Sequence, residues 1–289
     1  MPDTRPIGFF DSGVGGLTVL REVIRRLPAE STIYLGDNLR TPYGPRADDE
    51  VRRFSLECLD ELAARDVKAI VVACNTSSAV ALPAMRARYD VPIVGVVRPG
   101  ATAAALATRT RRVGVIATPA TVRSRAYFNA IKDENPFVEV YEHATPELVP
   151  LVEAGRLEGP EVEAAIARSL APLLGERGAD GEFVFPLPAD GRIDTLLLGC
   201  THYPLLAPLI ERAVGPGIAV IDSASATASA LAGLLEVNAL AAPDPAPGAA
   251  GADHLQLTTG DALAFRRTAQ RLFGQLFPTV EQVVVQGAA

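Results

Sequence analysis

Two cysteines stand directly after short apolar runs, and each is followed by polar side chains that can take part in proton transfer. An apolar run precedes Cys74, and Asn75-Thr-Ser-Ser78 follows it. Leu196–Leu198 precede Cys200, with His202 two positions further on. Such runs are typical of strands buried on both faces, and ligands of open α/β sheets bind at the carboxyl ends of strands. A thiol and an imidazole at this place indicate proton transfer or nucleophilic catalysis.

A buried structural cysteine is the alternative interpretation of each thiol, because free cysteine is among the most buried residue types. The repetition favours the functional interpretation, since Cys74 and Cys200 occupy the same place in the same kind of element. The third cysteine, Cys58, lies in an amphipathic run and is interpreted as helix packing. We therefore expect Cys74 and Cys200 to act as a pair.

A glycine-rich turn, Asp11-Ser-Gly-Val-Gly-Gly16, joins a predicted strand at residues 7–10 to a predicted helix at residues 17–27. Such a turn brings backbone N–H groups and a helix N-terminus toward an anion. Because the sequence contains neither a Walker motif nor a full dinucleotide fingerprint, a small carboxylate is the expected guest. The alternative is a tight turn in which Asp11 only caps the helix.

Composition restricts the class of protein and its partners. The chain has 289 residues, 48% hydrophobic and 21% charged, which is typical of a soluble globular protein large enough for two domains. No apolar run reaches the length of a membrane span, and a net charge of −7 argues against nucleic acid as a partner. Unpaired cysteines at functional positions indicate a reducing compartment, so we expect a cytoplasmic protein.

The sequence also argues against a bound cofactor or metal. Its only lysines are Lys68 and Lys132, and neither lies where a Schiff-base lysine for pyridoxal phosphate is expected. The three histidines are scattered, and no Cys or His pair has the spacing of a structural zinc site. We therefore expect an enzyme without cofactor and without metal.

Predicted strands and helices alternate in two series, the second beginning at Arg112-Val-Gly-Val-Ile-Ala117. This alternation predicts an α/β fold with two pseudo-symmetric lobes, mainly parallel sheets and the active site in the cleft between them. The expected divisions are a first lobe at residues 1–97, a second at 98–208 carrying Cys200 near its end, and a C-terminal segment at 209–289 returning to the first lobe. Residues 178–192 and 243–252 are rich in Gly, Pro and Ala or Asp and are predicted to be loops.

Four motifs, in this order, resemble the glutamate racemase family over nearly the whole chain. They are Asp11-Ser-Gly-Val-Gly-Gly16, Pro42-Tyr-Gly44, Ala73-Cys-Asn-Thr76 and Gly199-Cys-Thr-His-Tyr-Pro204. The resemblance implies a cofactor-independent racemase that interconverts L- and D-glutamate and supplies D-glutamate for peptidoglycan. The sequence departs from the family pattern at Thr145, where many members have cysteine. It also departs at Val97-Arg-Pro99, where an acidic residue commonly precedes the proline.

The resemblance also implies roles for individual residues. Cys74 takes the α-proton from D-glutamate and Cys200 takes it from L-glutamate. Asp11 and His202 assist the nearby thiols, and Glu153 orients His202. The expected substrate-binding residues are Asp11, Ser12, Tyr43, Gly44, Asn75, Thr76, Thr201 and His202.

Two other functions compete with this interpretation. A related cofactor-independent racemase could act on aspartate or another acid. A binding protein could close two α/β lobes on an amino acid without chemistry, although binding alone has no use for two thiols at matching strand ends. The expected partner is glutamate itself, and a homodimer is among the oligomeric states that the resemblance allows.

Overall fold

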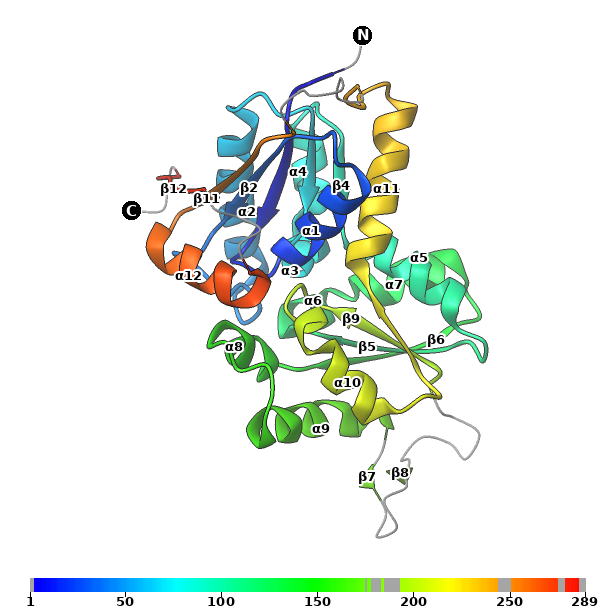
Figure 1. Ribbon diagram of the computed structural model, residues 1–289. Helices are drawn as coiled ribbons and strands as arrows, with labels where there is room; N and C mark the ends of the chain where they lie inside the picture. Colours follow the sequence, from blue (N-terminus) through cyan, green and yellow to red (C-terminus); the bar gives the residue numbers. More distant parts are fainter. Residues whose placement is uncertain are drawn as a thin grey trace.

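The computed structural model describes residues 3–174, 176–177, 183–184, 193–243, 251–274 and 279–285. Two lobes, each built on its own parallel sheet, form the molecule (Figure 1). The first sheet has the order β12-β11-β2-β1-β3-β4. Its strands are β1 (Ile7–Asp11), β2 (Thr32–Gly36), β3 (Ala69–Val72), β4 (Ile93–Gly95), β11 (His254–Thr258) and β12 (Val280–Gln282).

The second sheet has the order β10-β9-β5-β6. Its strands are β5 (Arg112–Ala117), β6 (Glu139–Ala144), β9 (Thr195–Gly199) and β10 (Ala219–Asp222). Every strand pair in these two sheets is parallel. A short antiparallel pair joins β7 (Glu176–Arg177), just before the stretch predicted to be a loop, to β8 (Phe183–Val184) within it. Residues 178–182 and 185–192 of that stretch lie outside the described residues.

The two sheets repeat one topology. The order β2-β1-β3-β4 in the first lobe corresponds to β6-β5-β9-β10 in the second. Cys74 follows the third strand of the first series, β3, and Cys200 follows the equivalent strand of the second series, β9. The predicted α/β fold with two pseudo-symmetric lobes is therefore confirmed.

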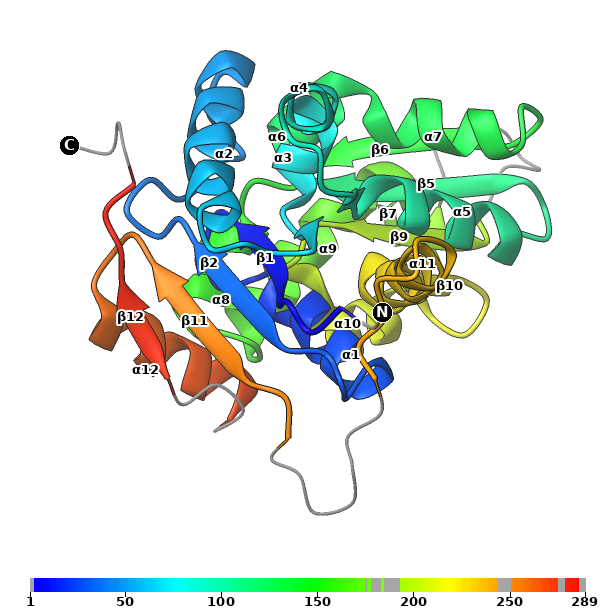
Figure 2. The same cartoon turned by 90° about the horizontal axis from the view of Figure 1, so that it is seen from above.

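Alternating side chains of the first sheet fill two cores. Phe9 and Val71 face α1 (Leu17–Arg26) and α12 (Ala262–Phe273). Phe10 and Val72 face the opposite side, where α2 (Asp48–Ala63) packs (Figure 2). Burial of each such large side chain contributes about 1.5–3 kcal/mol, so covering both faces fixes where the strand ends lie.

The second sheet is also covered on both faces. Val113, Val115 and Leu197 pack with α5 (Val97–Ala107) and α7 (Ala126–Glu134). On the other face, Ile116 and Leu196 pack with α9 (Pro160–Leu174) and α10 (Ala207–Val214). The remaining helices are α3 (Asn75–Val80), α4 (Leu82–Arg88), α6 (Pro119–Ser124), α8 (Leu148–Glu153), η1 (Tyr203–Leu206) and α11 (Ser223–Val237).

Some elements differ from the sequence-based expectation. The sequence from Val122 to Lys132 predicts one continuous helix, but the chain there forms parts of two helices, α6 and α7, separated at Arg125, whose backbone has φ 56°. The expected division at residue 208 falls inside the second sheet, because β10 pairs with β9. After α11 the chain reaches the first sheet, where β11 pairs with β2. Residues 244–250, within the second predicted loop, lie outside the described residues.

No helix in the described part of the chain is both long enough and apolar enough to cross a membrane.

Candidate active site

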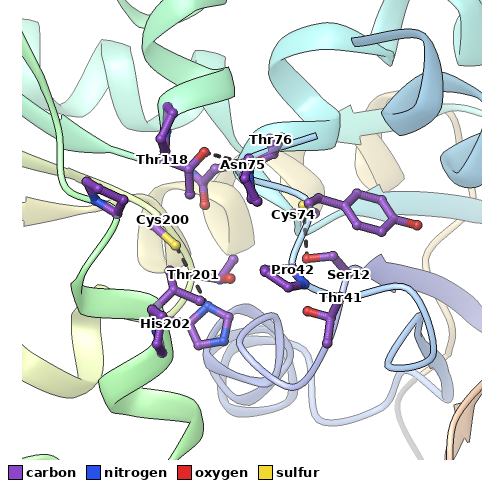
Figure 3. A pocket seen from close by; sticks show the side chains of 17 residues that line it. Ser12, Thr41, Pro42, Cys74, Asn75, Thr76, Thr118, Cys200, Thr201 and His202 are labelled. Carbon is purple, nitrogen blue, oxygen red and sulfur yellow. Dashed lines mark hydrogen bonds between the residues drawn. The ribbon is translucent and has the colours of Figure 1, made fainter. Parts of the chain in front are cut away.

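A cavity of about 240 Å³ lies between the lobes, at the carboxyl ends of β1, β3, β5 and β9 (Figure 3). Both lobes contribute to its wall. The lining residues are Ser12, Thr41, Pro42, Tyr43, Gly44, Pro45, Cys74, Asn75, Thr76, Thr118, Pro119, Pro146, Val149, Pro150, Cys200, Thr201 and His202. Cys74 and Cys200 project from opposite sides of this cavity, as Figure 3 shows.

Cys74 is the N-cap residue of α3. Its sulfur accepts a hydrogen bond from the backbone N–H of Ser77 at 3.4 Å and lies 3.6 Å from the hydroxyl oxygen of Ser12. Burial, reinforced by the nearby carboxylate of Asp11, raises the pKa of the Cys74 thiol to about 11, although the Ser77 and Ser12 contacts act in the opposite direction. Cys74 therefore carries its proton at neutral pH.

Cys200 has a buried imidazole beside it. Nδ1 of His202 lies 3.7 Å from the Cys200 sulfur. Nε2 of His202 lies 3.3 Å from Oε1 of Glu153, close enough for an ion pair although the two groups are not aligned as a hydrogen bond. Burial acts to lower the pKa of His202, but contact with Cys200 and Glu153 outweighs burial and raises that pKa to about 10. At neutral pH, His202 is therefore a cation between the sulfur of Cys200 and a carboxylate.

Asp11 lies beneath the cavity, at the end of β1, and is fully buried. Its Oδ1 accepts the backbone N–H of Gly13 at 2.9 Å, and its Oδ2 accepts the hydroxyl of Thr201, from the other lobe, at 3.4 Å. Burial raises the pKa of this carboxyl, against the stabilising charge of His202. Asp11 thus lies near Cys74 and contacts Thr201, the residue after Cys200, without lining the cavity itself.

Three buried threonine hydroxyls meet across the lobe boundary. Thr76 Oγ1 lies 2.9 Å from Thr118 Oγ1, and Thr121 Oγ1 lies within hydrogen-bonding distance of both, at 3.4 and 3.0 Å. Thr76 comes from α3 in the first lobe, whereas Thr118 and Thr121 follow β5 in the second. Neutral donors are therefore concentrated on one wall of the cavity, where they can bind a carboxylate.

The segment that contains Tyr43 and Gly44 forms another wall. Tyr43 donates its hydroxyl proton to Asp37, so its hydroxyl is engaged within the first lobe. The carbonyl of Gly44 accepts the backbone N–H of Ala120 at 3.0 Å, and a Cβ on Gly44 would lie only 2.8 Å from Thr118. Glycine at this position therefore allows the two lobes to approach closely.

Most of the predicted site residues line the cavity. The exceptions are Asp11 beneath it and Glu153, which lies behind His202. Sequence reasoning missed several lining residues, of which four are prolines: Thr41, Pro45, Pro119, Pro146, Val149 and Pro150. The only sequence signal for them was that they lie beside the recognised motifs and at the ends of predicted strands.

Comparison with known proteins agrees with this geometry. The model for the Asp/Glu/Hydantoin racemase family matches residues 7–181. The chain belongs to this family. A glutamate racemase from Exiguobacterium sibiricum is 44% identical over 266 residues, which are 92% of this chain and 91% of that protein.

Solved structures of the same family superpose over nearly the whole chain. A glutamate racemase isoform from Bacillus anthracis has a TM-score of 0.86 at 38% identity, covering 96% of this chain and 97% of that one. The glutamate racemase from Francisella tularensis, solved with D-glutamate, has a TM-score of 0.84 at 31% identity, covering 98% of this chain and 99% of that one. As a member of the racemase family, this chain shares the two-lobed fold with both.

Proposed function

We propose that the protein is a glutamate racemase that interconverts L- and D-glutamate through two thiols. The observation that carries the proposal is the placement of Cys74 and Cys200 on opposite sides of one cavity, each at the end of an equivalent strand. Glutamate racemases that are 38–44% identical over at least 91% of their own length support the choice of substrate.

The mechanism removes the α-proton from one face of the substrate and delivers a proton to the other. With L-glutamate, the Cys200 thiolate takes the proton, and the Cys74 thiol gives its own proton to the opposite face. With D-glutamate, the two roles are exchanged. The His202 cation stabilises the thiolate form of Cys200, and Glu153 holds the imidazole in place. Asp11 assists on the Cys74 side.

The carbanion formed between these two transfers needs stabilisation without a cofactor. Donors preorganised around the α-carboxylate supply it, because they favour the negative charge that develops in the transition state. The donors that we assign to the α-carboxylate are Ser12, the hydroxyls of Thr76 and Thr201, and the backbone at Gly44. Asn75, Tyr43 and His202 complete the substrate-binding set.

The product suggests the biological role. D-Glutamate is a component of peptidoglycan, so the enzyme supplies cell-wall synthesis from the cytoplasm. Glutamate is its small-molecule partner. A homodimer is the oligomeric state that we propose.

The test is direct. Incubation with L-glutamate should reduce optical rotation to zero, and enantiomer analysis should find D-glutamate. A panel of L-amino acids in the same assay identifies the substrate, and weak aspartate turnover is allowed because one methylene is worth only about 1–3 kcal/mol. Aspartate turned over faster than glutamate would favour the aspartate racemase. Binding of glutamate with unchanged rotation would favour the binding protein.

A further inference from the structure

A buried tyrosine outside the cavity contacts one of the residues that line it. The hydroxyl of Tyr127, from α7 in the second lobe, accepts a hydrogen bond from Nδ2 of Asn75, from α3 in the first lobe, at 2.6 Å. Tyr127 is fully buried and Asn75 is 2% exposed. The bond therefore crosses the lobe boundary, out of contact with water.

The position of Tyr127 is fixed by its surroundings. A Cβ on Gly199 would lie 2.9 Å from Cε2 of Tyr127, so the glycine that precedes Cys200 leaves room for the ring. Ser223, at the start of α11, lies beside the Tyr127 hydroxyl as well. Packing of the ring and the bond to Asn75 thus hold the hydroxyl in place.

This contact determines which end of the Asn75 amide is free. Because Nδ2 is engaged by Tyr127, the carbonyl oxygen Oδ1 is the remaining polar atom, and among the described residues it has no hydrogen-bond partner. An unpartnered buried acceptor costs about 1–3 kcal/mol. Asn75 lines the cavity, so a bound ligand can supply the missing donor.

We infer that Tyr127 is a positioning residue that orients the Asn75 amide so that Oδ1 receives the α-ammonium group of the substrate. The inference rests on the proposed glutamate racemase function and extends it. Both carboxylates of glutamate only accept hydrogen bonds, so the ammonium is the one group of this substrate that an amide oxygen can recognise. In Tyr127→Phe the Asn75 amide loses the acceptor that orients it, so it can turn either Oδ1 or Nδ2 toward the cavity.

The experiment separates ligands with and without an ammonium group. Tyr127→Phe keeps the ring that packs against Gly199 and removes only the hydroxyl. We expect KM for both glutamate enantiomers to rise about tenfold, the effect of one lost hydrogen bond to a charged group. The inhibition constant of glutarate, which has both carboxylates but no amine, should stay within about twofold of wild type. Tyr89→Phe removes a hydroxyl that is bonded to the carbonyl of Leu56 and to the carboxylate of Asp60, none of which lines the cavity. It is the matched control and should change neither constant.

A double-mutant cycle tests whether Tyr127 acts through Asn75. In an Asn75→Ala background, Tyr127→Phe should have no further effect on KM for glutamate, because the group that it orients is missing. Equal weakening of glutamate and glutarate, or additive effects in the double variant, would show a general structural role and overturn the inference. If wild-type protein does not racemise glutamate, the proposed function fails first. If wild type is active and Tyr127→Phe has an unchanged KM, only the present inference fails.

Discussion

Nδ1 of His202 lies 3.7 Å from the sulfur of Cys200, whereas the sulfur of Cys74 lies 3.6 Å from the neutral hydroxyl of Ser12. This difference makes the two thiols chemically unequal. The pKa of Cys74 is raised to about 11 by burial and by the charge of Asp11, so Cys74 is a thiol at neutral pH. The His202 cation thus lies beside Cys200, whereas the neighbour of Cys74 is a neutral hydroxyl.

The first prediction concerns His202→Asn, which removes the cation beside Cys200. A thiolate without a cationic neighbour forms only at higher pH. The rising limb of the pH profile of kcat/KM should therefore move to higher pH, and activity at neutral pH should fall. Since the two enantiomers have equal free energy, kcat/KM must be the same for both at every pH, so both profiles should move together. An unmoved limb would remove His202 from the proton-transfer machinery.

The same group should give the protein a pH-dependent stability. The folded-state pKa of His202, about 10, is above the ordinary value of 6.5. Between these two values the folded protein binds more protons than the unfolded chain, so the free energy of unfolding contributed by this group is fully present below about pH 6.5 and is lost as pH rises toward about 10. Urea denaturation across this range should show the decline in wild type and a flatter dependence in His202→Asn.

How far the site could be predicted from sequence depends on the range of each contact. Cys74 and Cys200 were found because an apolar run followed by a polar cluster is a local signal of a strand end. Tyr127 was not, because its partner Asn75 is 52 positions away and the two meet only through the packing of the lobes. The break at Arg125 between α6 and α7 was missed for another reason, since Arg125 has a φ of 56° although it is not glycine, and no residue type marks the break.

A contact outside the cavity should influence the position of α8. Arg271, on α12, donates to the carbonyl of Ala154 at 3.2 Å, just after α8, the helix that carries Glu153. A Cβ on Gly155 would lie 2.6 Å from this guanidinium, so the arginine packs closely against the helix end. Thr41 also donates to Glu153, at 3.4 Å. The first lobe therefore holds α8 at two points.

Arg271→Ala removes one of these two contacts, the hydrogen bond to the carbonyl of Ala154. We expect KM for both enantiomers to rise about two- to tenfold, because one hydrogen bond is worth about 0.5–1.5 kcal/mol and this one holds the helix that carries Glu153. Arg267→Ala, an exposed arginine on the same helix, is the matched control and should behave as wild type. Steady-state kinetics on the three proteins decide the matter, and an identical KM for Arg271→Ala and the control would exclude a role for this contact.

Gly15 should tolerate no side chain. A Cβ there would lie 2.4 Å from Oγ1 of Thr201 and 2.7 Å from Nδ1 of His202, which are both packed on the Cys200 side of the cavity. Gly15→Ala must displace one of them, and a displacement of about 1 Å in a catalytic group can cost about a hundredfold in rate. Gly217→Ala, where nothing lies within 4 Å of the added carbon, should retain wild-type kcat. Wild-type kcat in Gly15→Ala would show that this side of the site is loosely packed.

The last prediction concerns the two thiols themselves. If Cys74 and Cys200 act on opposite faces of the substrate, L-glutamate in deuterated water should give D-glutamate that carries deuterium at Cα. The remaining L-glutamate should stay protiated early in the reaction, because its α-proton leaves to one base and the new proton comes from the other. A single base serving both faces would instead place solvent label in both enantiomers from the start. Mass spectrometry of the separated enantiomers distinguishes the two patterns.

Removing either thiol tests the same mechanism from the protein side. Cys74→Ala and Cys200→Ala should each abolish racemisation, because the carbanion then has no acid on one face. Cys74→Ala should still exchange the α-proton of L-glutamate with solvent through Cys200, which shows that the variant is folded and binds substrate. Cys58→Ala is the control, since Cys58 lies on α2 in a hydrophobic core and does not line the cavity, and it should racemise as wild type does. Near wild-type turnover by Cys200→Ala would make Cys200 a structural cysteine, because a two-face proton transfer cannot proceed with one thiol missing.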